Sequence, residues 1–483
     1  MHVYAKLESQ KILTDEPAGT PKLKPADDLD VPTTLVTTLD NGLRIASQET
    51  YGQLSTYGLL ISAGARYDAQ FEKLTNPLKS TSVPIDDGTG ISHLAELMAF
   101  KGSTSFSPSE LVEQVESMGG AISSSSGREE LLLSVDTLRS HMPAGLGLLA
   151  ATINSPVIAV GEIDQMKQII AYMHQSLPPQ HILRESLQAA AYGADSQLGL
   201  AHLCTHEKSV YLTQEKLERY RRSFFSPERM VLSGAGVDHD EFVDYGNKYF
   251  GSMERSDLGS ANDLLVPSAY IGGESRITMA EPPPDGLVRV AVAFECSNWH
   301  DDDLVATCVL QVLLGGGDSF SAGGPGKGMY SRLYREVLNR FYWVEAAEAF
   351  TSIHSDSGMI GIAGASSSQR AGDLLMVFLE NFARLACDDV QDDELQRAKN
   401  MLRCNVLTQL ESRMVLFEDI GRQLLTYGKR ESPQVICKKI EAVTAADIRR
   451  VGKQLLSKKP SISCVGGDIS HVPMYERLVG SAK

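Results

Sequence analysis

The sequence predicts an α+β protein built from two halves of similar fold. Its 483 residues exceed what one hydrophobic core holds, which favours two or more domains. An internal repeat indicates that the halves are alike. Thr213–Leu217 and Thr444–Ile448 each begin a helix, and an apolar strand follows each at the same offset, Met230–Gly236 and Ser461–Gly467.

The first half shows strand and helix patterns after a polar arm over residues 1–30. Alternating apolar residues indicate strands, and apolar residues at helical spacing indicate helices. Ser107, Pro108 and Glu110 form a helix start, with Ser107 as N-cap and Glu110 completing a capping box. The expected strands are Gly42–Ser47, Ser55–Ala63 and Glu130–Val135, the expected helices carry His93 and Ile163–Met173, and Phe71–Gly90 is expected to be a loop.

The second half repeats this plan. The join is placed near Arg255–Gly273, which is rich in Ser, Gly, Asn and Asp. We therefore expect an N-terminal domain over 31–255, a linker over 256–275 and a C-terminal domain over 276–483. The expected strands are Leu287–Cys296 and Gly358–Ala365, and the expected helices are Asp301–Leu314, Met329–Val337 and a long one marked by Leu395, Ala398, Leu402 and Val406.

Composition and charge exclude some classes of protein. The net charge is −16 and Lys and Arg do not cluster, which argues against nucleic-acid binding. No apolar run approaches the roughly 18–20 residues that cross a bilayer, so we expect a soluble protein or one peripheral to a membrane. The seven cysteines are scattered without a C-x-x-C pair, as expected of reduced thiols. Residues 1–30 fit neither a secretory signal nor an intact transit peptide.

The segment from Ile91 to Gly102 carries two of the three defining residues of a metallopeptidase helix motif. His93, Glu96 and Leu97 stand at the spacing of the inverted zincin motif H-x-x-E-H. In that motif two histidines four residues apart hold zinc, and the glutamate is the general base for water. Leu97 cannot bind a metal, so these residues are degenerate remnants, and we expect neither a catalytic residue nor a metal site here. The alternative is an ordinary amphipathic helix with a chance His and Glu.

The surroundings of this helix resemble those of the pitrilysin-type metallopeptidases. An S-A-G-A-R-Y-D segment (Ser62–Asp68) precedes the helix and Ala-Phe-Lys-Gly follows it, whereas an active member reads H-x-x-E-H-M-A-F-K-G. The resemblance implies two homologous α/β halves, each a mostly antiparallel sheet packed with helices. It also implies a glutamate ligand roughly seventy-five residues after the second His. Ala171 and His174 occupy that neighbourhood, and the nearest acids are Glu162 and Glu185.

A glycine-rich segment is the most specific signal in the chain. A flexible linker is one interpretation, and a phosphate loop fails because Gly328 follows Lys327 where Ser or Thr is required. Free main-chain groups in such a segment could bind an extended peptide while tolerating varied side chains. The expected substrate-binding residues are Gly315, Gly316, Gly317, Asp318, Ser319, Phe320, Ser321, Gly323, Gly324, Pro325, Gly326, Lys327 and Gly328.

The stretch from Gly315 to Tyr334 closely resembles the glycine-rich loop of the alpha subunits of mitochondrial processing peptidases, and Ala349–Ile353 and Ser357–Gly361 also fit. The resemblance covers about residues 30–470. It implies a catalytically silent subunit without a cofactor of its own, a zinc-bearing beta subunit as heterodimer partner, and presequence peptides as ligands. It also implies the mitochondrial matrix or the matrix side of the inner membrane. In several lineages such a protein is also a core subunit of respiratory complex III.

The acidic balance suits basic presequences, and Asp318, Glu345 and Glu348 are candidates for attracting them. Solvated surface carboxylates are the alternative. Phe71–Gly90 looks longer than the corresponding family loop, and His93 and Glu96 are retained where many alpha subunits differ. Two other functions remain as alternatives, a purely structural core protein of complex III without processing and an active peptidase with altered ligands.

Overall fold

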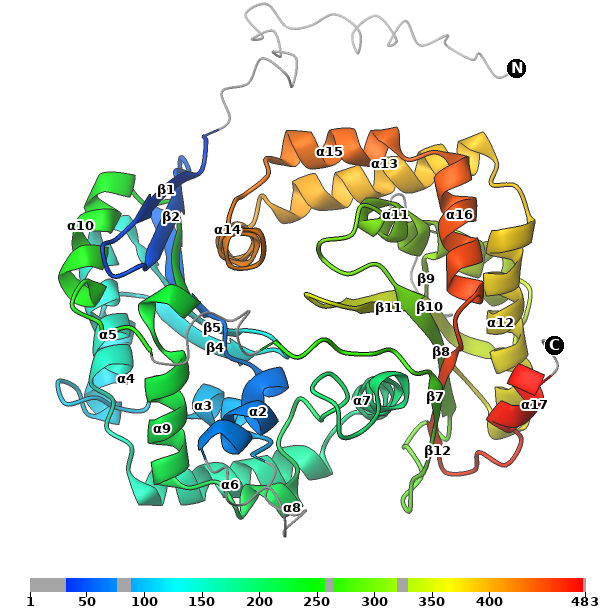
Figure 1. Ribbon diagram of the computed structural model, residues 1–483, viewed down its shortest axis with the longest axis horizontal. Helices are drawn as coiled ribbons and strands as arrows, with labels where there is room; N and C mark the ends of the chain where they lie inside the picture. Colours follow the sequence, from blue (N-terminus) through cyan, green and yellow to red (C-terminus); the bar gives the residue numbers. More distant parts are fainter. Residues whose placement is uncertain (1–31, 76–87, 257–264, 319–328, 481–483) are drawn as a thin grey trace, which may run out of the picture. The chain divides into compact units, whose positions relative to one another are not determined.

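Two mixed sheets, one in each half of the chain, organise the fold (Figure 1). The computed structural model describes residues 32–75, 88–256, 265–318 and 329–480, so the expected arm over 1–30 lies outside the described residues. The first sheet has the order β1-β2-β6-β3-β5-β4, with β1 Leu35–Thr38, β2 Arg44–Gln48, β3 Leu54–Ile61, β4 Ala121–Ser126, β5 Leu131–Leu138 and β6 Met230–Ala235. The second has the order β7-β12-β8-β11-β10-β9, with β7 Gly273–Thr278, β8 Val288–Cys296, β9 Gly316–Asp318, β10 Val344–Ile353, β11 Gly358–Ser366 and β12 Ser461–Gly466.

The topology confirms the internal repeat and the mostly antiparallel α+β fold. Strands β2, β6, β3, β5 and β4 stand in the same order as β7, β12, β8, β11 and β10. Among the described strands, β2 with β6 and β7 with β12 are the parallel pairs, and they occupy equivalent places. Near the end of each half a capped helix leads into a buried strand, α9 into β6 and α16 into β12. The Thr213 and Thr444 hydroxyls cap the two helices by accepting from the backbone N–H groups of Lys216 and Asp447.

Helices cover the faces of both sheets (Figure 1). In the first half they are α2 Ala65–Thr75, α3 Ile91–Leu97, α4 Pro108–Ser117, α5 Met142–Asn154, α6 Val160–Gln175, α7 Pro179–Tyr192, α8 His206–Ser209, α9 Gln214–Phe224 and α10 His239–Phe250. In the second half they are α11 Leu304–Leu314, α12 Ala371–Cys387, α13 Asp392–Gln409, α14 Arg413–Tyr427, α15 Pro433–Ala442, α16 Ala445–Leu456 and α17 Tyr475–Gly480. None of the described helices is long and apolar enough to cross a membrane.

The two halves exchange one helix each. The apolar side of α7 packs on the second sheet, where Leu183, Leu187 and Ala191 share a buried cluster with Ala293 and other residues of that sheet. The apolar side of α14 packs on β3 and β6 of the first sheet. A Cβ at position 421 would lie 2.1 Å from Leu60 Cδ1, so Gly421 lets α14 approach β3 closely. Each sheet therefore depends on a helix from the other half for part of its cover.

Two expectations about local structure were wrong. Phe71–Thr75 belongs to α2 rather than to a loop, because Phe71 is buried against the rings of Tyr220 and Phe224. Residues 76–87 of that expected loop lie outside the described part of the chain. The helix expected from Met329 is a π-turn over Tyr334–Leu338, and Met329 precedes it in an exposed turn.

Candidate functional site

His93 lies on α3 as expected, but it is buried and engaged. Its Nδ1 accepts a hydrogen bond from the Cys204 backbone N–H at 3.2 Å. Burial, with a smaller contribution from nearby His202, lowers the pKa of His93 to about 4, so the ring is neutral at pH 7. A neutral imidazole that accepts at Nδ1 carries its proton at Nε2, which is then a donor and offers no lone pair to a metal.

Glu96 is turned toward β4. One oxygen of its carboxylate accepts from both the backbone N–H and the hydroxyl of Ser126, and its carbonyl accepts from Ser124 Oγ at 3.1 Å. Leu97, at the place of the second histidine, packs against the core of the first half. A glutamate acting as general base would need to reach a metal-bound water, whereas this one stabilises the contact between α3 and β4.

The region expected for the third ligand offers no replacement. His174 is exposed at the end of α6, and Glu162 is half-buried at its start, whereas Ala171 has no donor group. Glu185 lies on α7, where Arg128 binds one carboxylate oxygen at 2.9 Å. Burial alone would raise the pKa of Glu185, but Arg128 and the His202 backbone N–H outweigh it and hold that pKa below its usual range. Within the described residues, no three His, Cys, Asp or Glu side chains are grouped closely enough to hold a metal ion.

A polar network that the sequence did not reveal joins these remnants. His202 Nε2 donates to the Ser126 carbonyl at 2.6 Å, and its backbone N–H donates to Glu185 at 2.9 Å. The chain of contacts therefore runs from Glu96 through Ser126, His202 and Glu185 to Arg128. Its members come from four separate segments of the sequence and form no motif, so no sequence signal could have identified His202, Ser126 or Arg128.

Residues of the Ser62–Asp68 segment bind both the start of α3 and the second half of the chain. The Asp68 carboxylate accepts from the Gly90 backbone N–H at 2.9 Å and from the Ser92 hydroxyl at 2.9 Å, which fixes the start of α3. The Arg66 side chain is fully buried and donates to both oxygens of Asp356, in the turn between β10 and β11, at 2.8 and 2.5 Å. Glu129 forms a second ion pair with Arg66.

The start of the glycine-rich segment is a structural element. Gly315 ends α11 with a φ of +58°, and Gly316 has a φ of +103°. A Cβ at position 316 would lie 2.0 Å from the Ala347 carbonyl oxygen, so β9 pairs with β10 only because glycine stands there. The expectation of free main-chain groups was therefore wrong for Gly315 and Gly316, whose groups bond to β10, Gln311 and Ser331. The expected ligand residues from Ser319 to Gly328 lie outside the described residues.

The acidic candidates differ in their surroundings. Asp318 is exposed at the end of β9 and Glu345 is half-buried. Glu348 pairs with Arg184 of α7 at 2.8 Å, and both side chains are about half exposed. This pairing reduces the charge that Glu348 offers to a basic ligand, and Asp318 is left as the better-exposed candidate.

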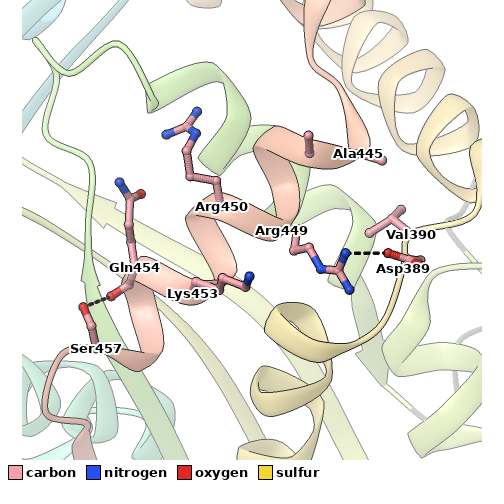
Figure 2. Close-up of a pocket in the computed structure, with 9 residues that line it drawn as sticks. Asp389, Val390, Ala445, Arg449, Arg450, Lys453, Gln454 and Ser457 are labelled. Carbon is pink, nitrogen blue, oxygen red and sulfur yellow. Dashed lines mark hydrogen bonds and ion pairs between the residues drawn. The ribbon is translucent and has the colours of Figure 1, made fainter.

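A surface hollow of about 650 Å³ lies beside α16 (Figure 2). Arg449, Arg450 and Lys453 line it, but Arg449 pairs with Asp389 at 2.8 Å and Arg450 pairs with Asp303 and Asp447. Three carboxylates thus offset three cations, so the hollow has no excess charge to attract an anion. We assign it no function.

Comparison with known proteins places these features in a family. The family model described as "Insulinase (Peptidase family M16)" matches residues 85–206, and "Peptidase M16 inactive domain" matches residues 211–402. The chain is 32% identical over 460 residues to the mitochondrial-processing peptidase subunit alpha of Homo sapiens, covering 92% of this chain and 84% of the relative. It is 33% identical over 472 residues to that of Solanum tuberosum, covering 96% and 88%.

The solved structures agree with the fold. A chain of "Complex III2 from Candida albicans, Inz-5 bound" matches with a TM-score of 0.75 and 19% identity, over 92% of this chain and 98% of that chain. Two repeated α+β halves with a degenerate H-x-x-E-H helix define an M16-type protein. The chain belongs to the family of mitochondrial-processing peptidase alpha subunits.

Proposed function

We propose that this protein is a non-catalytic, presequence-recognising subunit that pairs with a zinc-bearing homologue, the beta subunit of a mitochondrial processing peptidase. The observation that carries the proposal is helix α3, which has the H-x-x-E-H spacing but lacks the second histidine. Leu97 replaces a ligand, His93 accepts at Nδ1 from Cys204, and Glu96 is bound to Ser126. The relatives named as alpha subunits and the match to an inactive M16 domain support it.

The contribution to catalysis is positioning. A bound presequence whose scissile bond is held at the partner's zinc reacts as if the step were intramolecular, without an acid or base from this chain. We assign the peptide contacts to the glycine-rich segment, Gly315–Gly328. Since Gly315 and Gly316 are bonded to their surroundings, the contacts fall to the residues that follow.

Charge favours the same ligand. Presequences are basic amphipathic segments, and the protein carries a net charge of −16. Asp318, at the edge of the segment, supplies an exposed carboxylate where such a peptide would lie, and Glu345 and the Arg184-paired Glu348 lie on the neighbouring strand β10. Attraction of this kind raises the association rate and weakens with salt.

Reconstitution of the heterodimer tests the proposal. Deletion of residues 319–328 should abolish presequence cleavage while the two subunits still copurify. Unimpaired cleavage by the deleted heterodimer would refute presequence recognition by this segment. Stoichiometric zinc in the isolated chain, with chelator-sensitive cleavage, would instead support the alternative of an active peptidase with altered ligands.

A second role in respiratory complex III is compatible with the first. A chain of a complex III structure shares this fold, which supports the proposal that such a fold can serve in that assembly. We place the protein in the mitochondrial matrix or on the matrix side of the inner membrane. Native fractionation of gently solubilised mitochondria separates the possibilities. Comigration with cytochrome b and cytochrome c1 would indicate a core subunit, and failure of that complex to process presequences would indicate a purely structural one. Migration as a small soluble pair would remove the complex III role.

A further inference from the structure

A turn that presents an exposed tyrosine precedes β10. The backbone N–H groups of Arg340 and Phe341 both donate to the Val337 carbonyl, at 3.2 and 2.9 Å. The Val344 backbone N–H donates to the Phe341 carbonyl at 3.0 Å. These bonds fix the turn, and Tyr342 at its tip is 92% exposed. An aromatic side chain on a fixed backbone loses little conformational entropy when it enters a pocket of a partner.

Two arginines lie over the rings of the residues that flank Tyr342. The Arg340 guanidinium lies 5.2 Å from the centre of the Phe341 ring, and the Arg370 guanidinium lies 5.8 Å from the centre of the Trp343 ring. The two rings are 5.4 Å apart, and both pack against the core of the second half. Arg370 also interacts electrostatically with the Tyr342 phenol. We call these residues the Tyr342 patch: Arg340, Phe341, Tyr342, Trp343 and Arg370.

The Tyr342 patch carries positive charge on a chain whose net charge is −16. Arg370 pairs with Asp373 at 2.7 Å, but both side chains are more than half exposed, so water and salt screen the pair. Arg340 is exposed and has no carboxylate partner among the described residues. A guanidinium that lies over a ring keeps the N–H groups at its edge free for a carboxylate. The patch therefore combines donors for acidic groups with apolar ring surface.

We propose that the Tyr342 patch binds an acidic polypeptide segment of a partner protein. Carboxylates of the segment would bind Arg340 and Arg370, and an apolar side chain would pack against the Tyr342 ring. Tyr, Trp and Arg are the residue types that contribute most to binding at protein interfaces. The ligand differs from the one proposed above, because Arg340 repels a basic presequence.

Fluorescence anisotropy of labelled peptides, titrated with the full chain, tests this proposal. The probe is a fluorescein-labelled peptide of Glu, Leu and Pro, and its counterparts carry Gln or Lys in place of Glu. We expect the Glu peptide to bind with a Kd of about 10–100 µM, as a small interface allows, and to bind more weakly as salt is raised. The Gln peptide should bind about tenfold more weakly, and the Lys peptide more weakly still.

Substitutions in the patch should change this Kd in both directions. Tyr342→Ser and Arg340→Gln should each raise the Kd of the Glu peptide about tenfold. Arg340→Lys keeps the charge but loses the planar fork of N–H donors, so its Kd should fall between. Asp373→Asn removes the carboxylate that competes for Arg370 and should lower the Kd about threefold.

Tyr172→Ser and Arg397→Gln are the matched controls. Tyr172 is 73% exposed on α6, and Arg397 pairs with Asp393 on α13. Neither residue belongs to the Tyr342 patch, so neither substitution should change the Kd. All the substituted side chains are exposed, so the melting temperature should stay near the wild-type value in every variant.

Failure of the Glu peptide to bind, or a Kd that Tyr342→Ser and Arg340→Gln leave unchanged, would overturn the proposal. Tighter binding of the Lys peptide would overturn it too, as would binding of phosphatidylglycerol vesicles without binding of the Glu peptide. Presequence cleavage by the reconstituted heterodimer should be unchanged in Tyr342→Ser. The result therefore leaves the function proposed above to be judged by its own experiment.

Discussion

Asp356 is the residue whose removal best tests the contact between the two halves. Its carboxylate accepts from Arg66 through both oxygens and from the Ser268 backbone N–H at 2.6 Å. Arg66 is fully buried and Asp356 is 13% exposed. Asp356→Ala therefore leaves a buried guanidinium with Glu129 as its remaining charged partner, and breaking such a pair costs about 3–5 kcal/mol. We expect a loss of that size in the free energy of unfolding.

Urea unfolding of the isolated chain, followed by tryptophan fluorescence and circular dichroism, measures this loss. Asp373→Asn is the matched control, since Asp373 pairs with Arg370 on the surface with both side chains more than half exposed, and such pairs contribute less than about 1 kcal/mol. A loss below about 1 kcal/mol for Asp356→Ala would refute the claim that this ion pair holds the halves together.

The same pair has a pH dependence. Burial alone would raise the pKa of Asp356, but its hydrogen bonds to Arg66 and Ser268 outweigh it and lower that pKa. A carboxylate whose pKa is lower in the folded state stabilises the fold above its unfolded pKa of about 3.9. That stabilisation is lost as the pH falls through the folded pKa. Asp356→Ala should therefore flatten the stability curve below about pH 4.

Three further predictions concern helix α3 and the start of the glycine-rich segment. Gly316→Ala places a Cβ 2.0 Å from the Ala347 carbonyl oxygen at a φ of +103°, so it should detach β9 from β10. Urea unfolding should show a loss of about 1–3 kcal/mol in the free energy of unfolding. Gly161→Ala is the control, because a Cβ there meets no atom within 4 Å and should leave stability unchanged. The pKa of His93 falls to about 4 on folding, so the free energy of unfolding should decline as the pH falls from about 6.5 to 4. His93→Asn should reduce the slope of the unfolding free energy against pH by about one proton. An unchanged slope would contradict the buried neutral ring. Leu97→His should not create a tight zinc site, because no carboxylate replaces the third ligand among the described residues, and stoichiometric zinc by mass spectrometry would contradict this.

The sequence predicted what depends on neighbouring residues. The capping box predicted at Ser107 and the helix start predicted at Thr444 are both present, because a hydroxyl and an acid three positions apart are enough to cap a helix. The repeat was visible because β6 and β12 follow their helices at equal spacing. The C-terminal part of α2, Phe71–Thr75, was mistaken for a loop because burial of Phe71 depends on Tyr220, which is remote in the sequence.

The candidate site was only partly predictable for the same reason. His93, Glu96 and Leu97 lie within five consecutive residues, so the loss of a metal ligand could be recognised from the sequence alone. What Glu96 does instead depends on Ser126, which in turn bonds to His202, and neither residue belongs to a local pattern. The exchange of α7 and α14 between the halves also depends on the tertiary fold, since an apolar helix side does not reveal which sheet it covers.

Presequence binding by the isolated chain tests whether this subunit recognises the peptide without cleaving it. A fluorescently labelled presequence peptide would be titrated with the zinc-free chain and with a variant that lacks residues 319–328, and anisotropy and peptide integrity would both be recorded. We expect binding by the full chain, loss of binding in the variant and an intact peptide in both. Cleavage by the isolated chain, or binding that survives the deletion, would contradict it.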